Sequence, residues 1–122
     1  RDLALAEAAE IECGELAAAK IRFLLDHFKI DLNNFIRIQL GRNPLDVSRK
    51  RIILANEACR YNRIGFRTWR IWYEVVEISG GRHKVLVTDV TSNYTSEELL
   101  PEATDKYKDK DLHRLFQAEF GN

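Results

Sequence analysis

The stretch from Thr68 to Ser92 reads TWRIWYEVVEIS, then Gly80-Gly81, then RHKVLVTDVTS, and it predicts the centre of the fold. Both arms are rich in β-branched and aromatic residues, which are enriched in strands. Glycine adopts positive φ without strain, as the tight turns of hairpins require, so the glycine pair predicts the turn between the arms. We therefore expect a β-hairpin over about residues 67–92.

A hairpin closed at Gly80-Gly81 pairs Glu77 with Lys84 and Trp72 with Asp89. Side chains alternate between the two faces of a strand, so this register divides the hairpin into two sets. The largely apolar set, which we expect to pack against helices, is Trp69, Ile71, Tyr73, Val75, Leu86 and Val90. The opposite set, which mixes polar and apolar groups, is Arg70, Trp72, Glu74, Val76, Ile78, His83, Val85, Val87, Asp89 and Thr91. We expect this second face to be partly covered or to carry the function.

Helices are predicted on both sides of the hairpin. They run from Asp2 to about His27, over Leu32–Leu40, and over Leu112–Phe120. Asp31 and Asp111 are suitable N-cap residues for the second and third helices. We expect Gly41 to end the second helix and Gly121 the third, each as a positive-φ residue.

The segment between the second helix and the hairpin is ambiguous. Ser48 fits the cap of a short helix, whereas Arg51–Ala55 fits a first strand equally well. We favour a short helix that becomes extended after Cys59, with Gly65 breaking the pattern before the hairpin. The predicted fold class is α+β, with N-terminal helices, an antiparallel sheet and a C-terminal helix in one domain, residues 1–122.

Composition narrows the function classes. No run approaches the roughly 20 apolar residues that a membrane helix needs, so no membrane partner is expected. The chain has no methionine, and we expect it to be a trimmed or excised piece of a longer one. We interpret Cys13 and Cys59 as buried free thiols in a reducing compartment, the cytoplasm. The three histidines have no ligand-like spacing, so no metal site is predicted.

The zero net charge of the chain conceals a strongly basic segment. Residues 42–70 hold 8 basic and 2 acidic side chains, a net charge of +6, whereas residues 71–122 have a net charge of −4. The predicted RNA-binding residues of this segment are Arg49, Lys50, Arg51, Arg60 and Arg67. Basic side chains bind phosphates while interleaved aromatics stack on unpaired bases, as in proteins that bind single-stranded RNA. The same segment is also suited to docking an acidic protein, and its aromatics fit a strand core.

Four pieces of sequence, in order, resemble the RelE/ParE superfamily of small toxins within the barnase- and colicin-like ribonuclease folds. They are Gly41–Pro44, after the helical hairpin; Cys59–Gly65 and Trp69–Val75, which resemble two of the family's strands; and Lys84–Val90, which resembles its final strand. The resemblance covers about residues 43–99. Thr91-Ser92-Asn93 stands where the family has Gly-His-Arg or Gly-Lys-Arg, and Leu99 lies near the family's tyrosine. The strand that opens most family members is not expected, because the first 28 residues favour helix.

The resemblance implies a metal-independent endoribonuclease toxin without a cofactor, partnered by RNA and by a cognate antitoxin or immunity protein. Arg63 and Arg70 match the family's basic positions, and Tyr94 is a nearby substitute for its tyrosine. Cleaving RNA without a metal requires a proton acceptor and a cation for the phosphorane, so we assign Glu74 as the base and Arg70 as the phosphate clamp. A surface ion-pair network of Arg70, Glu74 and Asp89 is the alternative, as is a non-enzymatic interaction or nucleic-acid-binding domain.

Overall fold

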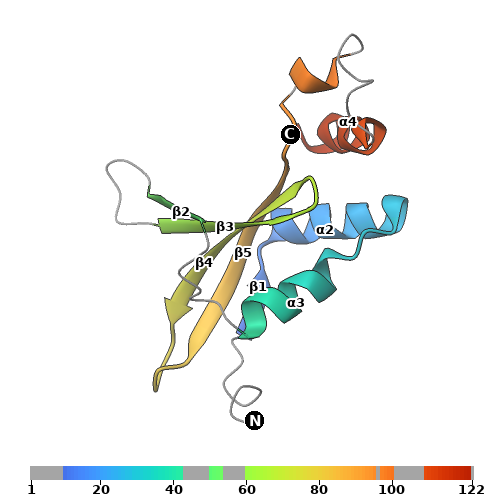
Figure 1. Ribbon diagram of the computed structural model, residues 1–122. Coiled ribbons are helices and arrows are strands. Elements are labelled where there is room, and N and C mark those ends of the chain that lie inside the picture. The colour runs from blue at the N-terminus through green and yellow to red at the C-terminus, as the bar shows by residue number, and fades with distance from the viewer. Residues whose placement is uncertain (1–9, 43–49, 54–59, 96, 101–108, 122) are drawn as a thin grey trace.

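The protein is an α+β fold, as predicted, and its five-stranded sheet is mixed, where we expected an antiparallel one (Figure 1). The computed structural model describes residues 10–42, 50–53, 60–95, 97–100 and 109–121. The elements are β1 (Glu10–Cys13), α2 (Glu15–Phe28), α3 (Leu32–Arg42), β2 (Lys50–Ile53), β3 (Arg60–Phe66), β4 (Trp69–Glu77), β5 (His83–Ser92), the 3-10 helix η1 (Glu97–Leu99) and α4 (Lys110–Phe120). The strand order is β1-β5-β4-β3-β2.

Strand β1 corrects two predictions: residues 10–13 form a strand where we expected a helix, and this strand makes the sheet mixed where we expected an antiparallel one. It pairs parallel with β5, from Glu10 opposite Lys84 to Cys13 opposite Val87, whereas the other strand pairs are antiparallel. The sequence of β1 alternates acidic and apolar residues, and Ile11 and Cys13 are half-buried while the two glutamates are exposed. The alanine-rich sequence around it favours helix locally, but the pairing with β5 decides the conformation of residues 10–13. Residues 1–9, where the predicted helix begins, lie outside the described residues.

Helices α2 and α3 cover one face of the sheet. The Gly14 N–H donates to the Val87 carbonyl oxygen at 2.9 Å, so α2 begins directly where the chain leaves the sheet. Asp31 caps α3 as predicted, because its Oδ1 accepts the Asn34 N–H at 3.2 Å. Gly41 does not end α3 with a positive φ; it is a buried residue inside the helix and lies beside Ile11.

The described residues between α3 and the hairpin are extended where we favoured a helix. Residues 50–53 form β2, the alternative assignment, and Arg60–Phe66 form β3, as expected after Cys59. Gly65 continues β3 rather than ending it, and it lies opposite Arg70 on β4. The predicted features at Pro44, Ser48 and Cys59 lie outside the described residues.

The hairpin forms as predicted, but its register changes once. Gly80 and Gly81 have φ of 59° and 77°, and Arg82 N–H donates to the Ser79 carbonyl oxygen at 2.9 Å. Trp72 pairs with Asp89 as predicted, whereas Tyr73 pairs with Val87, so Thr88 is an extra residue on β5. This β-bulge shifts the strand pairing by one residue between Tyr73 and the turn.

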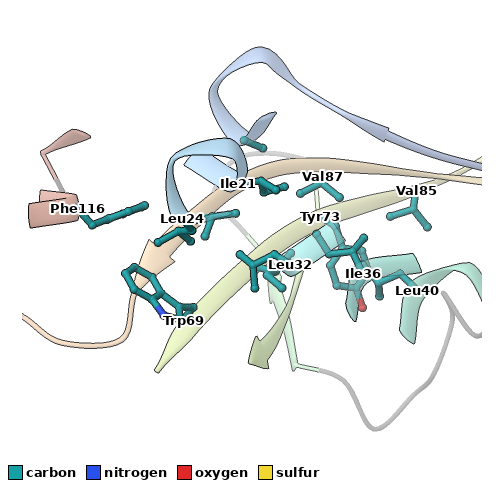
Figure 2. Packing of buried hydrophobic residues seen from close by; sticks show 13 residues of the cluster. Ile21, Leu24, Leu32, Ile36, Leu40, Trp69, Tyr73, Val85, Val87 and Phe116 are labelled. Carbon is teal, nitrogen blue, oxygen red and sulfur yellow. The ribbon is translucent and has the colours of Figure 1, made fainter. Parts of the chain in front are cut away.

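The bulge moves the core face of β5. As predicted, Trp69, Ile71, Tyr73 and Val90 are buried. Val85 and Val87 are buried in place of Leu86, which is half-buried and outside the core cluster, and Val75 is half-buried. The predicted pair of Glu77 and Lys84 is also wrong: Glu77 lies opposite His83, and Lys84 forms an ion pair with Glu12 of β1. Figure 2 shows side chains of β4, β5, α2, α3 and α4 meeting in one core.

The C-terminal helix α4 packs its aromatic face against the same core. Phe116 is buried and Phe120 half-buried, and Gly121 ends the helix with a φ of 86°, as predicted. One detail differs from the prediction: the N-cap is Asp109 rather than Asp111. Leu115 points outward, with 58% of its surface exposed. In the described part of the chain, no helix has both the length and the apolar character needed to cross a membrane.

Candidate functional site

Three of the predicted site arginines line one open pocket. It has a volume of about 310 Å³ and is lined by Arg63, Gly65, Arg67, Trp69, Arg70 and Asn93. These residues come from β3, from the turn that follows it, from β4, and from the segment after β5. We call this group the arginine pocket.

The register of β3 and β4 explains why the arginines converge. Arg63 lies directly opposite Trp72, and Gly65 lies directly opposite Arg70. All four residues lie on the face of the sheet turned away from the buried Ile71, because side chains alternate along each strand. Gly65 has no side chain to fill the space beside Arg70, so an open pocket remains there. The tight turn then brings in Arg67, which adopts a left-handed φ of 56°.

The described residues offer the positive charge of the pocket no acidic partner. Throughout the described ranges, no carboxylate forms an ion pair with Arg63, Arg67 or Arg70. Two of the guanidinium groups instead lie over aromatic rings: Arg63 Cζ is 5.5 Å from the Trp72 ring centroid, and Arg67 Cζ is 5.1 Å from that of Phe66. Such contacts orient a guanidinium group without neutralising it. The pocket is therefore suited to an anionic ligand.

The remaining predicted catalytic residues lie near the pocket but do not line it. Glu74 lies four residues beyond Arg70 on the same face of β4, about 13 Å away at about 3.3 Å per residue. Tyr94 follows Asn93, but its hydroxyl donates to Asp109 Oδ1 at 2.7 Å. Asp89 forms an ion pair with Lys20, with Nζ 2.7 Å from Oδ1, so it does not complete the surface network with Arg70.

The other predicted RNA-binding residues are placed only by their strands. Lys50 and Arg51 belong to β2, where they pair with Arg63 and Asn62 of β3, and Arg60 begins β3. The pairing of Lys50 with Arg63 extends the basic segment from the arginine pocket to the next strand. Arg49 lies outside the described residues.

Behind the pocket lies a buried polar cluster that the sequence reasoning did not anticipate. Its centre is His113 of α4, whose side chain is fully buried. His113 Nδ1 lies 2.5 Å from Ser92 Oγ, and Nε2 lies 2.7 Å from Thr68 Oγ1 and 3.2 Å from Asp109 Oδ2. Thr68 also donates a hydrogen bond to Asp109, and the His113 ring stacks on Trp69 at 3.8 Å. We call this group the His113 cluster.

The carboxylate of Asp109 determines where the protons of the cluster lie. An ionised carboxylate only accepts hydrogen bonds, so the Thr68 hydroxyl donates its one proton to Asp109. Thr68 Oγ1 is then an acceptor, and the neighbouring His113 Nε2 carries the imidazole proton. Nδ1 is left as an acceptor for the Ser92 hydroxyl, which itself accepts the Tyr94 N–H at 3.0 Å. Every polar atom around the neutral imidazole is thereby satisfied.

The surroundings in the cluster shift the pKa values of both His113 and Asp109. Burial lowers the pKa of His113, and the nearby Asp109 carboxylate only partly opposes this effect. Burial alone would raise the pKa of Asp109, but hydrogen bonds from Thr68 and Tyr94 and the adjacent imidazole hold it below its usual value. Both shifts favour a neutral His113 beside an ionised Asp109 at neutral pH.

The combination of serine, histidine and aspartate does not form a hydrolytic triad. Ser92 is only 5% exposed and His113 is fully buried, so a substrate cannot reach the hydroxyl. The cluster is structural, and one sequence signal pointed to it: Asp109 and His113 are four residues apart and share a helix face. We missed that signal because we began the helix at Asp111.

Neither cysteine chemistry nor metal binding adds to the site. Cys13 is a half-buried free thiol whose pKa is raised by burial and by Glu12, which disfavours a reactive thiolate. Cys59 lies outside the described residues. In the part of the chain that the structure covers, no three His, Cys, Asp or Glu side chains are grouped to hold a metal ion. A scan against models of known protein families and searches of curated proteins and of solved structures found no match to this chain.

Proposed function

We propose that the chain binds RNA through the arginine pocket and acts in the cytoplasm as a metal-independent endoribonuclease toxin of the RelE/ParE type. The observation that carries this proposal is the convergence of Arg63, Arg67 and Arg70 on one pocket, where no carboxylate of the described residues pairs with them. Guanidinium groups bind phosphate oxygens in a planar, bidentate geometry, which makes arginine well suited to phosphate recognition. The opening strand β1, which we did not expect, is one more element that the family resemblance implies.

The neighbouring side chains favour RNA over a free anion. Trp72 lies between Arg70 and Glu74 on the same face of β4 and is only half-buried. Its indole N–H donates to Thr91 Oγ1 at 2.8 Å, which fixes the ring against the sheet. A fixed aromatic ring beside phosphate-binding groups offers a stacking surface to an unpaired base. Along β4, Arg70, Trp72 and Glu74 therefore present a phosphate-binding group, a base-stacking ring and a carboxylate in this order.

Within Arg70, Trp72 and Glu74, we assign RNA binding and proton transfer to different residues. Arg70 holds a phosphate, and Glu74, whose Cα lies about 13 Å further along β4, serves another nucleotide. There Glu74 accepts the 2′-hydroxyl proton as that oxygen attacks the adjacent phosphate, and solvent water protonates the 5′-oxygen that leaves. Arg70→Ala should therefore weaken both RNA binding and cleavage. Glu74→Gln should abolish cleavage and leave the affinity for RNA unchanged.

The test combines an affinity measurement with a cleavage assay. Wild-type protein, Arg70→Ala and Glu74→Gln are incubated with a labelled single-stranded RNA in the presence of a chelator, and binding is followed by fluorescence anisotropy. Arg82→Ala is the matched control, because it removes one positive charge from the hairpin end, where Arg82 pairs with Glu10. The proposal requires Arg70→Ala to weaken RNA binding and to lower kcat/KM for cleavage by a similar factor, and Glu74→Gln to abolish cleavage at unchanged affinity. Equal effects of Arg70→Ala and Arg82→Ala would contradict it.

A second function, RNA binding without cleavage, is favoured by one observation. Among the described residues that line the pocket with Arg63, Arg67 and Arg70, none is a carboxylate or an imidazole, and the Tyr94 hydroxyl is engaged with Asp109. In that case wild-type protein binds RNA with the same dependence on Arg70 but leaves every RNA intact. Docking of a cognate antitoxin or immunity protein on the same arginines would instead appear as a complex with an acidic protein and no affinity for RNA.

A further inference from the structure

The arginine pocket is built from two segments that are far apart in the sequence but are joined behind the pocket. One is the β3–β4 turn and the start of β4, which contributes Arg67, Trp69 and Arg70. The other follows β5 and contributes Asn93. The Asn93 N–H donates to the Thr68 carbonyl oxygen at 2.8 Å, so the two segments meet directly beneath the pocket.

His113 contacts both segments from the opposite side. Its Nε2 meets Thr68 and its ring stacks on Trp69, within 13° of parallel, so it holds the first segment. Its Nδ1 meets Ser92, the residue before Asn93, so it also holds the second. One imidazole on α4 therefore spans the two pieces of chain that must stay together for the arginines to converge.

We propose that His113 is the positioning residue of the arginine pocket: its two ring nitrogens fix the β3–β4 turn and the segment after β5 in the relative placement that brings Arg67, Arg70 and Asn93 together. The proposal rests on the RNA-binding function proposed above for that pocket. His113 itself never meets the ligand, because it is fully buried. Its effect on RNA passes through Thr68 and Ser92.

The arrangement requires a neutral imidazole. Protonating Nδ1 would put a second donor against the Ser92 hydroxyl, which now donates to that nitrogen, and Ser92 would have to turn away. The described elements packed on His113 offer one carboxylate, Asp109, and one phenol, Tyr94, while Thr68, Trp69 and Ser92 do not titrate in this range. A single carboxylate already shared with Thr68 and Tyr94 does not restore the lost contact at Nδ1. Acidification should therefore loosen the pocket.

The experiment measures affinity for an oligouridine, whose bases do not titrate between pH 5 and 8, for wild-type protein and two variants. His113→Phe keeps the stacking on Trp69 but removes both ring nitrogens, so its affinity should be weaker than wild type at every pH. His113→Gln keeps a neutral donor for Thr68 and should not respond to pH. Wild-type affinity should fall with acidification by up to about tenfold per pH unit, the limit for uptake of one proton. Circular dichroism confirms that each variant is folded at each pH.

A second readout needs no RNA and separates this inference from the proposed function. The backbone amide resonances of Arg67, Arg70 and Asn93 are followed by NMR as the pH is lowered, beside the ring protons of His113. The inference requires the chemical shifts of these amides to change with the titration of His113 in wild-type protein and to stay constant with pH in His113→Gln. Amides that do not follow His113, or a wild-type pH dependence retained in His113→Gln, would overturn it. Amides that follow His113 in a protein that binds no oligouridine would support the positioning role and contradict RNA binding.

Discussion

The buried ion pair between Lys20 and Asp89 predicts a strong asymmetry between its two partners. Lys20 is only 3% exposed, whereas the Asp89 side chain keeps 33% of its surface in contact with solvent. The Lys20 ammonium lies 2.7 Å from Asp89 Oδ1 and 5.5 and 5.7 Å from the ring centroids of Phe116 and Phe120. Asp89 is thus the acidic partner of a nearly buried ammonium group that also lies over two aromatic rings.

Removing Asp89 should cost much more than removing Lys20. Breaking a buried pair by deleting one partner costs about 3–5 kcal/mol, because the other charge stays buried and unpaired. Since water reaches Asp89, we expect the lower end, about 3 kcal/mol, for Asp89→Ala. Lys20→Met places an apolar chain of similar length against the same two rings and leaves a carboxylate that solvent still reaches. Its cost should be below about 1 kcal/mol, because the carboxylate that remains is solvated, as in a surface ion pair.

Urea denaturation of the two variants and of wild-type protein measures these free energies of unfolding. For a chain of this size, a loss of 3 kcal/mol also lowers Tm by roughly 10 °C, at about 3–5 °C per kcal/mol. If Asp89→Ala lost less than about 1 kcal/mol, the ion pair would behave as a surface pair and Lys20 would find solvent without it. If Lys20→Met lost as much as Asp89→Ala, the attraction between the partners, and not the stranded charge, would be the stabilising term.

Three further predictions concern glycines and pH. Gly81→Ala should destabilise the protein by about 1–2 kcal/mol, because a residue with a side chain is strained at its φ of 77° although no atom lies within 4 Å of the new Cβ. Gly41→Ala should instead stabilise it by about 0.5–1 kcal/mol, since Gly41 is helical and the new Cβ would meet Ile11 Cδ1 at an ordinary 3.6 Å; urea titrations distinguish the two signs. The pKa of His113 is lowered on folding, so the unfolded state binds more protons below about pH 6.5; the free energy of unfolding should fall as the pH drops through this range, and His113→Gln should reduce the fall.

The hairpin and the arginines could be predicted because both depend on neighbouring residues. The glycine pair specified the turn, and the strand pattern on either side specified which residues pair near Trp72. Arg63, Arg67 and Arg70 lie within eight residues of sequence on two strands joined by a tight turn, so strand pairing alone brings them together. In these two places local pattern was sufficient, because the contacts that form them are local.

The remaining features depend on contacts that no local pattern specifies. The extra residue at Thr88 leaves no mark in the alternation of the sequence, yet it exchanges Leu86 for Val85 and Val87 in the core. Strand β1 is stabilised by a parallel partner more than 70 residues away, against the helix preference of the alanines beside it. The His113 cluster joins three elements, and its centre depends on where α4 begins.

The central claim is that three arginines of one pocket bind phosphate groups, and the salt dependence of RNA binding tests it most directly. Each phosphate contact on single-stranded RNA contributes a slope of about −0.7 to log K against log salt concentration, so three contacts contribute about −2. The triple variant Arg63→Ala, Arg67→Ala, Arg70→Ala should bind more weakly, with a slope that is less steep by about 2 than that of wild type. A triple variant with the wild-type slope, or wild-type binding that ignores salt, would contradict the claim.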